Sequence, residues 1–174
     1  VFVFADQWRA QATGYANDPN VRTPQLDALA EESVSFRRMV AGCPVCSPYR
    51  ASLLTGQYPL THGVFVNDVC LSRSAPSFAD VLNAAGYTTG YIGKWHLDGH
   101  GRSAFIPPER RQGFRYWRVL ECTHKYFDSW YYGDGPEKRK WPGYDAEAQS
   151  REAQGFLRAQ AGRGPFALFL SLGP

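Results

Sequence analysis

Apolar residues along the chain fall into short runs that are typical of buried strands. Continuous apolar runs occupy residues 1–5 (VFVFA) and 166–172 (FALFLSL), and residues 87–92 are rich in Tyr, Thr and Ile. Strands that are buried on both faces have this composition. Residues 34–40 alternate between apolar and polar positions. The pattern therefore predicts four strands.

Helix signals mark four further segments. Proline follows Thr23, which is the order expected at a helix start, and glycine follows each of the other three segments, where it favours a helix stop. The first predicted helix begins at Thr23-Pro24 and has Leu26, Leu29 and Ala30 as its apolar face. The other three cover residues 48–54, 76–85 and 145–161, and Asp145 is the predicted cap of the last one.

Strands that alternate with helices indicate an α/β fold, with a mostly parallel sheet flanked by helices. In open sheets of this kind, ligands collect beyond the carboxyl ends of the strands. Polar residues follow three of the predicted strands: Asp6-Gln7, Cys46 and Lys94 to His96. Residues 99–144 are predicted to form a long irregular loop region rich in aromatic residues, and long loops are often functional.

Composition narrows the class of protein. The chain has 174 residues, of which 44% are hydrophobic and 20% charged, so we expect one domain with a sizeable core. The net charge is +3 and the basic residues are scattered, which argues against nucleic acid as a partner. No apolar run approaches the length of a membrane span. Both ends are apolar strands, whereas natural domains usually begin and end in polar segments, so we expect a piece of a longer protein.

The stretch CPVCSPYRASLLTGQYP, residues 43–59, contains a C-x-x-C pair that allows three interpretations. A redox pair would place the nucleophile at Cys43, with a helix starting at the motif itself. A structural zinc site needs about four ligands, and the sequence has no second close pair. The third interpretation treats Cys46 as one special residue and Cys43 as a small buried side chain.

The surroundings of Cys46 favour the third interpretation. Cys46 lies at the amino end of the predicted helix, where free N–H groups and the helix dipole favour an anion. Arg50 follows four residues later, on the same helical face. Pro48 fits the first helical turn. One reactive side chain would then lie beside a cationic, anion-binding corner.

These residues resemble a known family. Cys46-Ser47-Pro48-Tyr49-Arg50, followed by Leu53-Leu54-Thr55-Gly56, is similar to the signature of the type I sulfatases in the alkaline phosphatase superfamily. Asp6 after a first strand, Thr23-Pro24-x-Leu26-Asp27 and Gly93-Lys94-Trp95-His96 fit the same family in the same order. The resemblance is strong over residues 1–98. It implies that the chain is the amino-terminal part of a single sulfatase catalytic domain with an incomplete alkaline-phosphatase-like fold.

The resemblance also implies the chemistry. In this family the cysteine is oxidised after translation to formylglycine by a formylglycine-generating enzyme, which would act on Cys46. One hydroxyl of the hydrated aldehyde attacks the sulfur of a sulfate monoester, and the other releases sulfate afterwards. A small molecule or a carbohydrate could carry the sulfate ester.

Roles for individual residues follow from the same resemblance. Asp6, Gln7 and formylglycine at position 46 would hold a divalent cation, most often Ca²⁺, although many relatives have Asp where this chain has Gln7. Arg50 would stabilise the formylglycine, Lys94 would contact a sulfate oxygen, and His96 would act as a base. The spacing of Lys94 and His96 by two predicts that both lie on one face if the strand continues.

Several expectations remain open at the level of the sequence. His124, in the long loop region, is a candidate substrate contact. The remaining metal ligands and the acid for the leaving group are expected beyond residue 174, so this stretch alone should be inactive. Two alternatives are a phosphonate or phosphate ester hydrolase of the same superfamily and a non-catalytic, anion-binding relative. The resemblance suggests a periplasmic or secreted protein, and nothing in the sequence fixes the oligomeric state.

Overall fold

A computed structural model describes residues 1–173 of the chain, in two compact units. The larger unit contains Val1–Asp6 and the chain from Gly42 onward, and the smaller unit contains Gln7–Ala41. Among the described residues, no helix is both long enough and apolar enough to cross a membrane.

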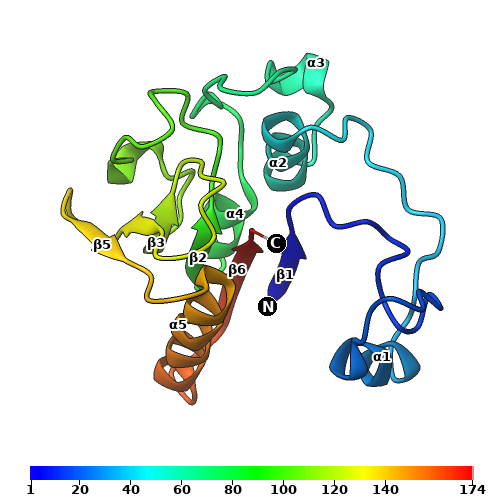
Figure 1. Ribbon diagram of the computed structural model, residues 1–174. Helices are drawn as coiled ribbons and strands as arrows, with labels where there is room; N and C mark the ends of the chain where they lie inside the picture. The colour runs from blue at the N-terminus through cyan, green and yellow to red at the C-terminus, as the bar shows by residue number, and fades with distance from the viewer. Residues whose placement is uncertain (174) are drawn as a thin grey trace. The chain divides into compact units, whose positions relative to one another are not determined.

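The larger unit is built on a six-stranded mixed sheet with the strand order β1-β6-β2-β3-β4-β5 (Figure 1). The first four strands in this order pair in parallel, and β4 and β5 extend the sheet as antiparallel strands. The α/β class and the parallel arrangement around β2 and β6 are therefore confirmed. The strands are β1 (Phe2–Ala5), β2 (Thr88–Lys94), β3 (Tyr116–Leu120), β4 (Trp130–Tyr132), β5 (Lys138–Lys140) and β6 (Phe166–Leu172).

Helices cover both faces of this sheet. Successive residues of a strand point to opposite faces, so Tyr91 joins one core cluster and Ile92 the other. The cluster of Ile92 includes Phe156 of α5 (Asp145–Gln160), which runs alongside β6 and β2 in Figure 1. The cluster of Tyr91 includes residues of two further helices, α2 (Cys46–Thr55) and α4 (Phe78–Ala84). The short helices α3 (Pro59–His62) and η1 (Pro108–Arg110) complete the unit.

Local chemistry explains where these helices begin and end. Ser77 and Asp80 form a reciprocal capping box at the start of α4. Gly56 ends α2 in the left-handed conformation, with φ 68°, as glycine does at many helix ends. Asp145 is the first residue of α5 and not its cap, which is Tyr144. Its carboxylate instead accepts a hydrogen bond from Ser129 Oγ at 3.1 Å.

The smaller unit contains one helix, α1 (Pro24–Glu31), which begins at proline after Thr23 as predicted. The Thr23 hydroxyl makes no capping bond to the helix and instead donates to Asp27 at 2.8 Å. The predicted apolar face is wrong, because α1 buries no residue and Leu29 is 60% exposed.

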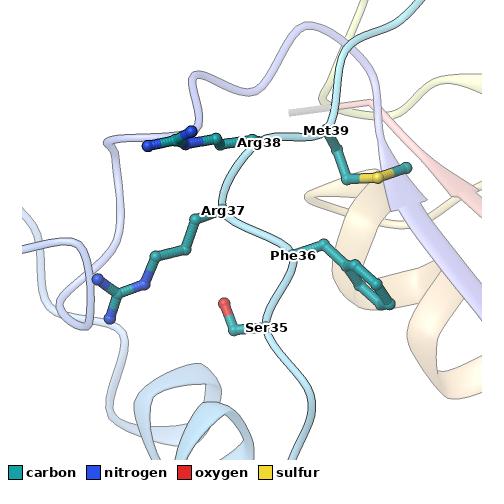
Figure 2. Close-up of a pocket in the computed structure, with 5 residues that line it drawn as sticks. All are labelled: Ser35, Phe36, Arg37, Arg38 and Met39. Atoms are coloured by element: carbon teal, nitrogen blue, oxygen red, sulfur yellow. The ribbon is translucent and has the colours of Figure 1, made fainter.

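The strand predicted over residues 34–40 is also wrong. The segment contains no strand, and residues 34–40 are all exposed. Residues 35–39 line an open pocket, in which Phe36 and Met39 point to one side and Arg37 and Arg38 to the other (Figure 2). Two consecutive arginines break the alternation that a half-buried strand requires.

Residues 99–144 are more regular than predicted, because β3, β4 and β5 and the helix η1 all lie within them. Tyr116–Leu120 is rich in aromatic and β-branched residues and pairs with β2, but it has only five residues and no clear alternation of polar and apolar positions. β4 and β5 have three residues each, which is too short for a periodic pattern to be recognised.

Candidate active site

Three of the predicted site residues converge in the larger unit. Asp6 follows β1, Cys46 is the first residue of α2, and Lys94 is the last residue of β2. Cys46 Sγ lies 3.7 and 3.8 Å from the two carboxylate oxygens of Asp6 and 3.6 Å from Lys94 Nζ. Lys94 Nζ also donates a hydrogen bond to Asp6. The three side chains thus form one polar centre at the carboxyl ends of parallel strands, where ligands collect in such sheets.

The backbone explains this convergence. The Asp6 N–H donates to Leu172 O at 2.9 Å, which continues the pairing of β1 with β6. Val45, the residue before Cys46, is the N-cap of α2. Its apolar side chain cannot accept a hydrogen bond from the helix. Asn67 Oδ1 accepts from the Ser47 N–H at 2.9 Å and so satisfies one of the free helix donors. Cys46 does not follow a strand, contrary to the sequence prediction, because residues 34–40 form none.

Opposite charges hold Asp6 and Lys94 in their ionised forms. Burial raises the pKa of Asp6, but the Lys94 hydrogen bond and the charge of Arg50 lower it further, and the pKa ends below its usual value. Burial lowers the pKa of Lys94, but the hydrogen bond and charge of Asp6 raise it above its usual value. A carboxylate and an ammonium group therefore face Cys46 at neutral pH.

Arg50 is buried beneath this centre and fixes the strands around it. Its side chain is 2% exposed, and one guanidinium nitrogen donates to Lys94 O at 2.6 Å and to Ser171 Oγ at 2.7 Å. The other terminal nitrogen lies 3.6 Å from Asp6 Oδ2. Arg50 thus joins α2 to the ends of β2 and β6 and adds positive charge beside Asp6.

Lys94 and His96 are predicted to share a face only if the strand continues, and this condition is not met, because β2 does not reach His96. β2 ends at Lys94, and His96 has a φ of 57°, which turns its side chain away from the strand alternation. His96 is buried, and its Nε2 lies 2.9 Å from Asp68 Oδ1. Burial lowers the pKa of His96 more than Asp68 raises it, and the ring is neutral at pH 7.

A buried carboxyl group anchors the chain after His96. Glu121 Oε1 accepts from the N–H groups of Asp98 and Gly99 at 2.8 and 3.0 Å, while Oε2 is buried without a partner in the described part of the chain. The Glu121 carbonyl also accepts from the His96 N–H at 2.7 Å. Burial raises the pKa of Glu121 to about 7. The sequence contains no signal for this role.

Two other predicted site residues are exposed. Gln7 belongs to the smaller unit and has a φ of 52°. His124 is exposed on the segment between β3 and β4 and makes no side-chain hydrogen bond within residues 1–173. Cys43 and Cys46 are both free thiols.

The donor set fits a divalent cation only in part. Asp6 offers hard carboxylate oxygens beside position 46, which suits Ca²⁺. However, residues 1–173 contain no group of three or more His, Cys, Asp or Glu side chains arranged to hold a metal ion. Ca²⁺ takes six to eight oxygen ligands. The described residues therefore do not by themselves provide the set of oxygen ligands that Ca²⁺ requires.

The fold and this centre define an α/β protein with a free cysteine at a helix start, flanked by the charged side chains of Asp6 and Lys94. A sequence model described as Sulfatase matches residues 1–173, and the chain belongs to the sulfatase family.

Relatives and solved structures agree with this assignment. The chain is 53% identical over 162 residues to an ulvan-active sulfatase of Formosa agariphila, an alignment that covers 92% of this chain and 32% of the relative. The crystal structure of the sulfatase yidJ of Bacteroides fragilis superimposes with a TM-score of 0.91 at 32% identity, over 99% of this chain and 43% of that one.

A further solved structure holds its substrate, D-glucosamine-2-N,6-O-disulfate, and has a TM-score of 0.83 at 28% identity, over 98% of this chain and 33% of that one. The chain spans about a third of the length of the curated relatives it matches.

Proposed function

We propose that the full-length protein hydrolyses a sulfate monoester carried by a carbohydrate, with formylglycine at position 46 as the nucleophile. The observation that carries the proposal is the convergence of Cys46 with Asp6 and Lys94, at 3.6 to 3.8 Å, in a chain of the sulfatase family. Relatives named for activity on ulvan, or solved with a sulfated glucosamine as substrate, support a carbohydrate.

Conversion of Cys46 is a two-electron oxidation of Cβ. The carbon–sulfur bond breaks, a carbonyl oxygen replaces the sulfur, and the sulfur leaves as sulfide. The formylglycine-generating enzyme would couple this step to the reduction of molecular oxygen to water, for which a thiol reductant supplies the other two electrons and becomes a disulfide. The hydrated aldehyde then offers two hydroxyl groups, so the same carbon can bind the sulfuryl group and release it, which a serine cannot do.

The neighbouring side chains have distinct tasks in this proposal. Lys94 contacts an oxygen of the sulfuryl group and offsets the charge that develops in the transition state. Arg50 holds Asp6 and the end of β2 in place from below. His96, buried and neutral, accepts the proton when sulfate is released. His124 is a proposed substrate contact.

Asp6, Gln7 and the modified residue at position 46 would hold a divalent cation, for which we propose Ca²⁺, together with ligands from the remainder of the protein. When bound, the cation would polarise the nucleophile and neutralise sulfate oxygens.

The test uses full-length protein that is co-produced with a formylglycine-generating enzyme. Hydrolysis of a sulfate ester is compared with that of its phosphonate and phosphodiester analogues. We expect preferred turnover of the sulfate ester, its loss in Cys46→Ala and unchanged turnover in Cys43→Ser. Activity that survives Cys46→Ala, or that depends on Cys43, would contradict the proposal. A preference for the phosphonate analogue would indicate the alternative ester class.

A further inference from the structure

Asp68 is a hydrogen-bond partner of His96, and no motif in the sequence assigns it a role. Its Oδ1 lies 2.9 Å from His96 Nε2. Arg102 donates to both carboxylate oxygens of Asp68, from Nε at 3.0 Å and from a terminal nitrogen at 2.7 Å. This bidentate pair leaves the carboxylate little freedom to rotate. Asp68 lies between α3 and α4, outside the C-x-P-x-R and G-K-W-H motifs.

The contact fixes which nitrogen of the His96 ring carries the proton. A neutral imidazole has one N–H and one lone pair, and the partner of one nitrogen determines the state of the other. A carboxylate can only accept, so Nε2 must carry the proton toward Asp68. Nδ1 is buried and has no hydrogen-bond partner within residues 1–173. It is therefore left as the proton acceptor.

We propose that Asp68, clamped by Arg102, is a positioning residue that fixes the tautomer and orientation of His96 and leaves Nδ1 as the base. This inference rests on the proposed function, because it requires His96 to accept a proton during the reaction.

The backbone and the charges around His96 agree with this role. Asp68 and His96 have φ values of 65° and 57°, an uncommon conformation outside glycine that persists where the surroundings enforce it. Arg102 and His96 hold the pKa of Asp68 well below its usual range, so Asp68 remains a carboxylate. Lys94 and Arg50 are the cations that act on His96 and favour its neutral form.

The variant Asp68→Asn tests the inference in the full-length, formylglycine-containing protein. An amide oxygen at Oδ1 could still accept from His96 Nε2 and Arg102 Nε, but the NH₂ group in place of Oδ2 would face the terminal N–H donor of Arg102. The bidentate clamp is therefore lost, and the amide is free to turn away from the orientation that fixes the His96 tautomer. The side chains of Asp68 and its ion-pair partner Arg102 are 45% and 54% exposed, and exposed ion pairs contribute little to stability, so the fold should persist. Asn also tolerates the left-handed conformation.

Asp128→Asn is the matched control. Asp128 also has a positive φ, of 51°, is 50% exposed, and lies 3.5 Å from a cation, Lys140. Within residues 1–173, the Asp128 side chain contacts Gly143 N and Lys140 Nζ and makes no hydrogen bond or ion pair with His96.

Two readouts separate positioning from a merely structural contact. We expect kcat for the sulfate ester to fall about 10- to 100-fold in Asp68→Asn with little change in KM, as found when the partner of a functional histidine is removed. Imidazole ¹⁵N spectra, assigned by comparison with His96→Gln, should show the Nε2–H form in the parent protein and its loss in Asp68→Asn. Asp128→Asn should match the parent in both.

The outcomes distinguish failure of the inference from failure of the proposed function. Unchanged kcat and an unchanged His96 tautomer in Asp68→Asn, beside an inactive His96→Gln, would overturn the inference alone. Full activity in His96→Gln would overturn the role of His96 as well. If Asp68→Asn does not fold, Arg102→Gln replaces it; a loss of kcat with altered His96 spectra supports the inference, and parental values of both overturn it.

Discussion

Glu121 gives the protein a pH-dependent stability that can be worked out from the structure. The side chain is 1% exposed and holds the chain after His96 through two backbone N–H groups. Burial raises its pKa from 4.5 to about 7, so the folded state binds the proton more tightly than the unfolded state. Below pH 4.5 Glu121 is protonated in both the folded and the unfolded state, so it gives the free energy of unfolding no pH dependence there.

As the pH rises from 4.5 to about 7, the unfolded state ionises first and stability falls. Above about pH 7 both states are ionised and the loss is complete. At about 1.36 kcal/mol for each pKa unit, the total loss is about 3 kcal/mol.

The assay compares Glu121→Gln with the parent by denaturant unfolding of the full-length protein at several pH values. The amide keeps the acceptor for Asp98 and Gly99 but cannot ionise, and any unpaired NH₂ group costs the same at every pH. The variant should therefore gain about 3 kcal/mol relative to the parent between about pH 4.5 and pH 8. Asp128→Asn should show no such trend, because a backbone N–H and Lys140 keep the pKa of Asp128 below its usual value. A constant difference between Glu121→Gln and the parent would refute the reasoning.

Three further predictions concern the surroundings of the site. Gly93→Ala should cost about 3 kcal/mol of stability, because the added Cβ would lie 1.9 Å from Ser171 O and the backbone has a φ of 104°. Gly155→Ala, where the Cβ on α5 would meet open space, should instead stabilise the protein by about 0.5–1 kcal/mol, and thermal unfolding measures both variants. Arg50→Lys should cost on the order of 3 kcal/mol and abolish turnover, since one ammonium cannot replace both the nitrogen that donates to Lys94 O and Ser171 Oγ and the second nitrogen beside Asp6. Parental stability would contradict this. Residues 1–174 produced alone should show no turnover and weak Ca²⁺ binding by calorimetry, and full Ca²⁺-dependent activity would refute the need for further ligands.

The parts of the fold that the sequence predicts well are those with strong local signals. β1 and β6 are apolar runs, and α4 carries a capping box and a glycine stop. The convergence of Asp6 with Lys94 follows from a general property of parallel sheets, whose strand ends lie at one edge.

Long-range contacts explain what the sequence could not predict. Asp68 is separated from His96 by 28 residues and from Arg102 by 34, and no spacing or motif connects them. The sequence around Glu121 does not distinguish it from a surface glutamate, because only the fold shows that it is buried and bonded to the N–H groups of Asp98 and Gly99. The alternation over residues 34–40 suggested a strand, but a strand also needs a neighbour to pair with, which a local pattern does not report.

The central claim is that Cys46 becomes the catalytic nucleophile, and peptide mass tests it most directly. Full-length protein co-produced with a formylglycine-generating enzyme is digested with trypsin, and the peptide from Met39 to Arg50, which holds Cys43 and Cys46, is fragmented. We predict a loss of about 18 Da located at Cys46, as expected when a thiol becomes an aldehyde. Two intact thiols, beside a control sulfatase that is converted, would contradict the account.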